Sequence, residues 1–388
     1  MTARPHIDDA QRRARLGVRQ LLAPQHRAAT PEQVTRAVVA LHASDPASVF
    51  LSTAARLADP APVAAVEKAL YEDATLVRMH GMRRTLFVVP AGLASTVQAS
   101  TTVKVAAKER IGFTAFAATG GFDTDWLAEA EREALTALER AGQATGSQLG
   151  ALVPRLREEI TVSAGKPYEA RQTIGTRMLR VLGMEGSIVR RRPVGGWTSG
   201  QHHWATQRPY PDRPAAEAQA ELARQWLAAY GPATVEDLRW WTGWGLREVR
   251  AALAACAAVP VGLTEGEGFV LPEDTGPVTE PAPWVALLPA LDPAPMGTRY
   301  RHWFLPDEHQ GELFDRSGNI GPTVWSDGRI VGGWAQRPDG EITWQLLEPV
   351  GREAESAVGA EAARLSAWVG ATRITPRFRT PLERRLSA

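Results

Sequence analysis

The sequence predicts a mainly α-helical α+β fold in which three similar units are followed by a small antiparallel β-barrel. Three observations support this prediction. Three segments open with the same Ala-Thr pair before a short amphipathic stretch. Each of these segments then continues into a further helix and a hairpin-like pair of extended runs. Beyond residue 277, prolines and glycines separate several short strand-like runs.

The shared openings are predicted helix starts. They place Thr30, Thr145 and Thr234 at the N-cap position, where a threonine hydroxyl accepts a hydrogen bond from the first turn. Pro31 then falls at the first helical position, where its missing N–H costs nothing. Longer helices precede the three openings. We expect Asp8 and Asp9 to cap the first, and the others to span about residues 126–140 and 215–230.

Each opening leads to a further helix and then to two extended runs. The helices are expected over residues 63–71, 172–184 and 246–257. The paired runs are expected over residues 76–78 and 86–89, residues 187–192 and 197–199, and residues 259–263 and 269–271. Helix, short helix, helix and hairpin is the order of a winged helix, and three matching copies indicate a repeat. We therefore expect winged-helix units over residues 1–115 (with a connecting helix), 116–212 and 213–276.

The last segment, residues 277–388, has a different character. Strands are expected over residues 284–288, 323–325, 329–334 and 341–347, and Asp-Gly pairs at 327–328 and 339–340 are typical hairpin turns. These strands predict the β-barrel, followed by a helix over about residues 353–369 and a basic tail. Twelve of the 13 tryptophans lie from Trp197 onward, and most are expected to fill the third unit and the barrel.

Several protein classes are excluded by composition. The chain has 388 residues, and no apolar run approaches the ~20 residues that span a bilayer. Asp8 and Asp9 lie where a signal peptide would have its apolar core, so secretion is not expected. The single cysteine, Cys256, excludes an intramolecular disulfide framework and a cysteine-based zinc site. We expect a cytoplasmic protein.

Motifs for metals and cofactors are also missing from the sequence. There is no glycine-rich phosphate loop ending in Gly-Lys-Ser/Thr and no His-Glu-x-x-His. His202 and His203 are adjacent, so they point in different directions and make a poor metal pair. Lys104 and Lys108 share a helix face, but nothing marks either as an imine-forming nucleophile. We expect no metal and no cofactor.

Arginine dominates the basic residues. The formal net charge is only +1, but 40 of the 44 basic residues are arginines. A genome rich in G and C explains this composition, whereas planar guanidinium groups also suit phosphates and guanine edges. Clusters on predicted hairpins and in the tail favour contacts with a DNA backbone, although charge clusters are often only solvated surface. The candidate DNA-binding residues are Arg83, Arg84, Arg190, Arg191, Arg192, Arg377 and Arg379.

A polar turn at residues 42–45 is the candidate catalytic site. His42, Ser44 and Asp45 follow the first short helix, and the proline after Asp45 bends the chain there. A structural alternative stays open, in which Asp45 caps the next helix and His42 satisfies a core hydrogen bond. If this segment is helical, His42 and Asp45 share a face while His42 and Ser44 do not, which favours Asp45 over Ser44 as the partner of His42.

Together, these features resemble the winged-helix DNA glycosylases of the AlkZ and YcaQ type. The resemblance covers nearly the whole chain and depends on the three units, the His42-Ala43-Ser44 turn and the tryptophan-rich C-terminal segment. It also depends on Tyr71-Glu72-Asp73 before Leu76-Val77-Arg78, and on the hairpin Met82-Arg83-Arg84-Thr85-Leu86-Phe87. Family members carry Gln, an aliphatic or aromatic residue, and then Gln or Asp at this turn. Here His42 stands in place of the first Gln, and Ser44 in place of the second residue.

The resemblance implies a monomeric, monofunctional glycosylase that hydrolyses the N-glycosidic bond of N7-alkylated purines in duplex DNA, including bulky adducts. His42 would then handle the attacking water, with a rate that rises through the ordinary histidine pKa of about 6.5, helped by Asp45 or Ser44. Association with the nucleoid would accompany DNA binding. Two alternatives are a catalytically silent DNA-binding protein, such as a regulator or lesion sensor, and a protein–protein scaffold.

Overall fold

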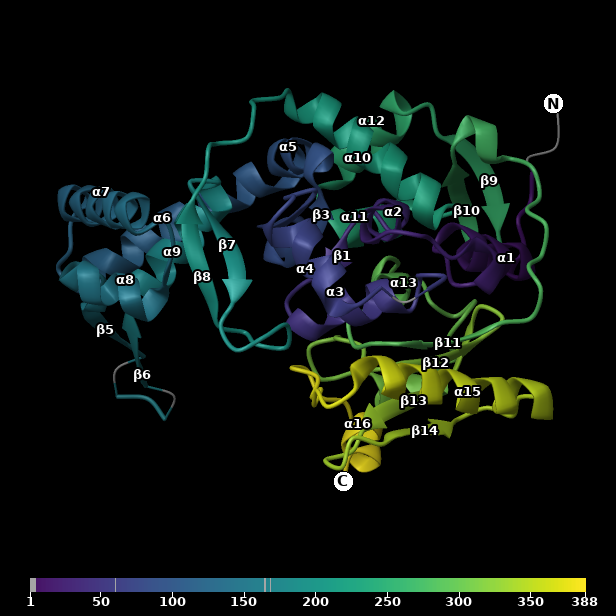
Figure 1. Cartoon of the computed structure of the whole chain (residues 1–388). Coiled ribbons are helices and arrows are strands. Elements are labelled where there is room, and N and C mark those ends of the chain that lie inside the picture. Colours follow the sequence, from purple (N-terminus) through teal and green to yellow (C-terminus); the bar gives the residue numbers. More distant parts are fainter. Residues whose placement is uncertain (1–4, 60, 164, 168) are drawn as a thin grey trace.

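The protein is described by a computed structural model that covers residues 5–59, 61–163, 165–167 and 169–388 (Figure 1). Its first group of elements comprises α1 (Asp9–Arg19), α2 (Pro31–Ala37), β1 (Leu41–His42), α3 (Pro46–Ala54), α4 (Val63–Tyr71), β2 (Leu76–His80) and β3 (Leu86–Pro90). The three strands form a sheet in the order β1-β3-β2. The short β1 thus pairs with the second strand of the hairpin.

From α2 onward, the order of the first group is a helix, a short strand, two helices and a hairpin, and the second group repeats this order. It comprises α7 (Thr124–Ala141), β4 (Ala144–Thr145), α8 (Gly146–Leu152), α9 (Ile174–Glu185), β7 (Ile188–Pro193) and β8 (His202–Thr206), with the sheet order β4-β8-β7. A hairpin of β5 (Glu159–Val162) and β6 (Ala170–Thr173) is inserted between α8 and α9. The helices α5 (Ala94–Val97) and α6 (Val103–Thr119) connect the first group to the second.

The third group has the same plan in a reduced form. It comprises α10 (Ala215–Tyr230), α11 (Val235–Thr242), α12 (Leu246–Ala255), β9 (Val259–Leu263) and β10 (Gly266–Val270). A single bridge from Ala233 to Phe269 of β10 replaces the short first strand. In all three groups the expected threonine is the N-cap, since Thr30, Thr145 and Thr234 each accept a hydrogen bond from the third helical residue.

The C-terminal segment is an open sheet, so the expectation of a closed barrel was wrong. Strands β11 (Val285–Leu288), β12 (Thr323–Ser326), β13 (Arg329–Gln336) and β14 (Ile342–Leu346) pair antiparallel in chain order. No pairing joins β14 back to β11 among the described residues. Instead, α15 (Arg352–Val369) contacts β11 and β14, and α16 (Pro381–Leu386) contacts β13. Helices therefore cover apolar surface that barrel closure would have buried.

The second hairpin also differs from the expectation. Residues 197–199 are not a strand, because Gly195 and Gly196 adopt positive φ and the returning strand begins only at His202. Trp197 leaves the hairpin and is buried between the rings of Phe50 and Trp368, at centroid distances of 5.3 and 5.7 Å. The tip of this hairpin is thereby attached to α3 and α15, as Figure 1 shows for the loop between β7 and β8.

A buried ion pair joins the first group to the C-terminal segment. The Arg56 guanidinium donates to both carboxylate oxygens of Asp292 at 2.8 and 2.7 Å, and neither side chain is exposed. Asp292 also accepts the Ser52 hydroxyl and caps the short helix α13 (Pro293–Met296). Cys256 is buried and free, as expected. Within the described residues, no helix is both long and apolar enough to cross a membrane.

Candidate functional site

A cleft of about 570 Å³ opens where the first group, the third group and the C-terminal segment meet. Its residues come from β1, the β2–β3 turn, α11, α13, and the loops before β12 and α16. The lining consists of His42, Ser44, Arg83, Thr85, Trp240, Met296, Arg301, Gln310, Phe314, Ser317, Gly318, Asn319 and Phe378. None of these lining residues is acidic.

His42 lies on strand β1, and its backbone pairs with Phe87 of β3. The polar turn is therefore extended rather than helical, so the helical spacing that favoured Asp45 over Ser44 does not occur. Pairing with β3 determines this geometry, which short-range propensity did not predict. The imidazole lies against the Phe87 ring at a centroid distance of 5.2 Å, and its buried Nδ1 has no hydrogen-bond partner among the described residues.

Burial keeps the His42 imidazole neutral. Loss of solvation lowers the pKa of His42 to about 3, and the nearby positive charge of Arg83 acts in the same direction. At neutral pH the ring is therefore unprotonated, and one of its two nitrogens can accept a hydrogen bond. Because Nδ1 is enclosed, a water molecule in the cleft would have to be held through the other ring nitrogen, Nε2.

Asp45 has a structural position next to this cleft. One carboxylate oxygen accepts the backbone N–H of Ala47 at 3.1 Å, which caps α3, and the other accepts the backbone N–H of Arg377 at 2.9 Å. Burial nevertheless raises the pKa of Asp45. Asp45 is not among the residues that line the cleft, whereas Ser44 is. Ser44, rather than Asp45, thus shares the cleft with His42.

Arginines and aromatic rings form one wall of the cleft. The guanidinium groups of Arg83 and Arg301 lie 3.9 and 4.9 Å from the Trp240 ring centroid. Arg83 adopts a left-handed backbone with φ +52°, which is uncommon for a residue with a side chain. Gly243, with φ +75°, leaves room for it, since a Cβ there would meet Arg83 Cγ at 3.2 Å. The local packing therefore holds Arg83 in position.

The candidate DNA-binding arginines have different surroundings. Arg83 lines the cleft, and Arg377 donates to the Ser44 carbonyl at 3.3 Å. Arg84 forms an ion pair with Glu109, and Arg379 with Glu383. On β7, Arg190 lies 5.2 Å from the Trp204 ring centroid, Arg191 is half-buried, and Arg192 pairs with Glu67 and Glu72.

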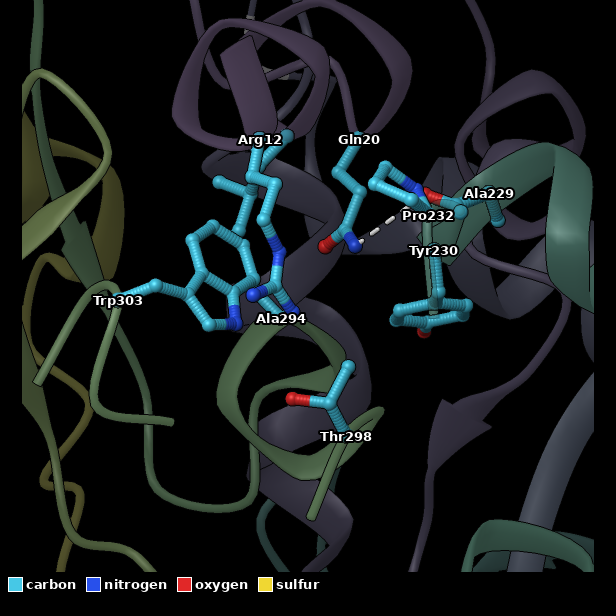
Figure 2. A pocket seen from close by; sticks show the side chains of 10 residues that line it. Arg12, Gln20, Ala229, Tyr230, Pro232, Ala294, Thr298 and Trp303 are labelled. Carbon is cyan, nitrogen blue, oxygen red and sulfur yellow. Dashed lines mark hydrogen bonds between the residues drawn. The ribbon is translucent and has the colours of Figure 1, made fainter. Parts of the chain in front are cut away.

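Other cavities are less suited to nucleic acid. A cavity of about 10 Å³ between α1, α10 and α13 has room for about one water molecule. Figure 2 shows Arg12 beside Trp303, and Gln20 bonded to the backbone of Ala229. A cleft of about 540 Å³ beside α15 includes Asp327, Glu353 and Glu361, whose charges repel phosphates. In the described part of the chain, no group of three or more His, Cys, Asp or Glu side chains is placed to hold a metal ion.

Of the cleft residues, only His42, Ser44 and Arg83 were predicted site residues, and the large aromatic and basic side chains that the sequence did not indicate are Trp240, Arg301, Phe314 and Phe378. They are distant in sequence from His42 and come together only in the folded chain. The concentration of tryptophans was a signal, but it did not distinguish Trp240 from Trp241, which is buried in the core.

Comparisons with known proteins match this architecture. A sequence family described as "DNA glycosylase AlkZ-like" matches residues 35–368. The interstrand DNA cross-link repair glycosylase of Streptomyces sahachiroi is 29% identical over 178 residues, which are 44% of this chain and 47% of that protein. The chain thus spans about half the length of this curated relative. The solved structure of the Streptomyces sahachiroi DNA glycosylase AlkZ is 21% identical, with a TM-score of 0.71 over 96% of this chain and 99% of that one. At this identity, the similarity shows a common fold.

Proposed function

Because the chain belongs to the AlkZ-like DNA glycosylase family, we propose that it is a monofunctional glycosylase that hydrolyses the N-glycosidic bond of N7-alkylated purines in duplex DNA. The single observation that carries the proposal is the neutral His42 imidazole, which has an unpartnered buried nitrogen and lines a large non-acidic cleft. In this proposal the three repeated groups are winged-helix units spanning residues 1–115, 116–212 and 213–276, and residues 277–388 complete the cleft.

The proposed chemistry needs little proton donation. Alkylation at N7 makes the purine cationic, so the base leaves with the electron pair of the glycosidic bond and becomes neutral. Water then adds to the sugar C1′ and loses one proton. A His42 pKa of about 3 makes the ring a weak base, so its role is to orient this water by accepting a hydrogen bond. The Ser44 hydroxyl, which lines the same cleft, can hold the water from a second side.

The cleft has room for an extruded base. Its volume of about 570 Å³ lies within the ~300–1,000 Å³ range of small-molecule sites. Its aromatic rings are partly covered by guanidinium groups, since Arg83 and Arg301 lie over Trp240 and Arg301 also lies over Phe314. Guanidinium planes and aromatic rings can both stack on an extruded purine. These dimensions support a substrate that carries a bulky N7 adduct. The cross-link repair named for the Streptomyces sahachiroi relative is consistent with a large lesion.

The DNA would be held by arginines around the cleft. Arg83, Arg301 and Arg377 belong to or adjoin the cleft, and their charges favour the phosphates of the strand that carries the lesion. We propose that one copy of the chain suffices, since a lesion does not present two symmetric half-sites. Light scattering on the protein with and without duplex DNA tests this: a dimer on a single lesion would contradict it.

Base release from duplexes with a single N7-methylguanine or a bulky N7 adduct tests the catalytic proposal. Under single-turnover conditions His42→Ala should lower the release rate by about 100-fold or more and leave DNA affinity nearly unchanged. Ser44→Ala should have a smaller effect. The matched control is Ser317→Ala, which removes a hydroxyl from the same cleft away from β1. If His42→Ala acts at the wild-type rate, the turn is structural. If the wild type binds DNA but releases neither base, the protein is a silent DNA-binding protein.

A further inference from the structure

A second cluster of basic side chains lies outside the cleft, where the hairpin of the second group meets the sheet of the first. Arg78 is on β2 and Arg190 is on β7, and these two strands are in contact. Arg377, from the segment before α16, contributes positive charge to the surroundings of Arg190. Two strands distant in sequence therefore bring Arg78 and Arg190 together beside one small cavity, and Arg377 is near enough for its charge to act on Arg190.

Much of the hydrogen-bonding capacity of this cluster is unused. Arg78 is only 7% exposed, and its buried Nε and Nη2 have no hydrogen-bond partner among the described residues. The buried Nε of Arg190 and the buried Nε2 of His202 on β8 are likewise unpartnered. An unpaired buried polar group costs about 1–3 kcal/mol. The cavity between Arg78 and Arg190 is only about 10 Å³, which is room for about one water molecule, so a larger anion would meet mainly the half-buried Arg190 and the exposed Arg377.

Arg78 and Arg190 lack a compensating carboxylate in the described part of the chain, whereas Arg377 lies close to the carboxylate of Asp45. Within the described parts of the chain, neither Arg78, Arg190 nor Arg377 forms an ion pair with Asp or Glu, in contrast to Arg192 on the same strand. Burial, together with the like charges of Arg78 and Arg377, lowers the pKa of Arg190 to about 10. The pKa of the neighbouring His202 is lowered to about 4 for similar reasons. An anion would relieve this electrostatic strain.

The cluster adjoins the proposed catalytic turn. The Arg377 guanidinium donates to the carbonyl oxygen of Ser44, and Ser44 lines the cleft with His42. Arg377 thus links the basic cluster to the cleft. If a base of a DNA strand enters the cleft, the phosphate of the same nucleotide must lie nearby, because it is covalently linked to that base through the sugar.

We infer that Arg78, Arg190 and Arg377 form a binding site for a DNA phosphodiester that adjoins the nucleotide whose base occupies the His42 cleft. This inference extends the proposed function. The phosphate would accept hydrogen bonds from the guanidinium groups and provide a negative charge beside Arg78 and Arg190, which have no ion-pair partner among the described residues. A planar guanidinium is well suited to this bidentate geometry.

The first experiment compares stability and DNA affinity, using Arg78→Met and Arg190→Met. The DNA is a duplex that carries one tetrahydrofuran abasic analogue, so no base release is needed. Each variant should bind about tenfold more weakly, and the log–log salt slope should fall by about 0.9. Arg132→Met, which also removes one positive charge but is paired with Glu129 on α7, should bind like the wild type.

The stability arm excludes a merely structural role. Removing an uncompensated buried guanidinium should leave the urea midpoint unchanged or raise it. The control is Arg15→Met, because Arg15, like Arg78, is buried but is paired with Asp274, so its loss should lower the midpoint. Lower midpoints for the Arg78 and Arg190 variants with unchanged DNA affinity would overturn the inference.

The second experiment locates the phosphate. Single uncharged methylphosphonate linkages are placed in turn at the positions that flank the abasic analogue. At the contacted position, neutralising the phosphate should weaken wild-type binding about tenfold but should weaken Arg78→Met no further. If the ratio of the wild-type affinity to the Arg78→Met affinity is the same for every position of the methylphosphonate linkage, Arg78 contacts none of these phosphates and the inference fails.

The two proposals fail separately. If these binding results hold and no lesion base is released, the glycosylase proposal fails and the phosphate site remains. If base is released and the Arg78 and Arg190 variants bind like Arg132→Met, the phosphate site fails and the glycosylase proposal remains.

Discussion

The Asp45 carboxylate accepts a hydrogen bond from the backbone N–H of Arg377 at 2.9 Å, which joins the start of α3 to the segment before α16. The same carboxylate caps α3 through the N–H of Ala47. Asp45 thus holds together two parts of the chain that both contribute to the cleft, since Ser44 lies on one side of this contact and Phe378 on the other. Its role is to position the cleft.

Removing this connection should loosen the cleft. Asp45→Ala loses the helix cap and the long-range bond, so we expect a loss of about 2 kcal/mol in the free energy of unfolding. Asp45→Asn retains one carbonyl oxygen and should lose less. Urea denaturation measures both, and limited proteolysis near Arg377 reports on the released segment. Wild-type stability of Asp45→Ala would show that the bond contributes nothing.

The rate of base release should not follow a histidine titration. The pKa of His42 is lowered to about 3, so the imidazole stays neutral from pH 5 to pH 8 and its protonation does not change over this range. This differs from the rise through about pH 6.5 expected from the ordinary histidine pKa. Single-turnover rates between pH 5 and pH 8, corrected for spontaneous depurination, should be flat. A rise with an apparent pKa near 6.5 that disappears in His42→Ala would contradict the prediction.

The folded protein should lose stability in mild acid. The pKa values of His42 and His80 are lowered to about 3 and that of His202 to about 4, mainly by burial. Below about pH 6.5 the unfolded chain therefore binds more protons than the folded chain, so stability falls as the pH falls towards 4. Each such histidine contributes about 1.4 kcal/mol per pH unit. In His80→Leu the decrease in the free energy of unfolding between pH 7 and pH 5 should be about 2 kcal/mol smaller than in the wild type. An equal decrease in both proteins would show that His80 does not contribute to it.

No covalent intermediate should form through lysine. Lys104 is paired with Glu248 and its side chain is 68% exposed, and no lysine lines the cleft. A lysine that forms an imine must have a lowered pKa and must lie close to the reacting carbon. No lysine meets these conditions here, so the product should be an intact strand with an abasic site. Borohydride treatment during the reaction, followed by denaturing electrophoresis, should trap no protein–DNA adduct. A trapped adduct, or strand cleavage without heat or alkali, would refute a purely hydrolytic reaction.

The buried Arg56–Asp292 pair should be strongly coupled. Asp292→Ala leaves the Arg56 guanidinium buried without a counter-charge, so the free energy of unfolding should fall by about 3–5 kcal/mol. The double variant Arg56→Met with Asp292→Ala should recover part of this loss, because no isolated charge remains. Urea denaturation of the two single variants and the double variant measures the coupling. Additive losses would show that the two side chains act independently.

Local signals in the sequence determined the helices and most hairpins. Thr30, Thr145 and Thr234 cap their helices because a cap depends only on residues within the first turn. Strands β2, β3 and β9 lie where β-branched and apolar runs predicted them, whereas β10 begins at Gly266, three residues before the expected start. The resemblance to the AlkZ and YcaQ type of glycosylase, which depends on the repeated units, the His42 turn and the hairpin over residues 82–87, is confirmed by the family match over residues 35–368.

Long-range pairing decided the remaining features. The C-terminal sheet stays open because α15 and α16 cover it, and nothing in the strand sequences themselves distinguishes an open sheet from a barrel. His42 is extended because β1 pairs with β3, and Asp45 leaves the cleft lining because Arg377 approaches it from the other end of the chain. The same holds for charge. Arg192 meets two glutamates whereas Arg190 on the same strand meets none, because ion pairs form between side chains that only the tertiary structure brings together.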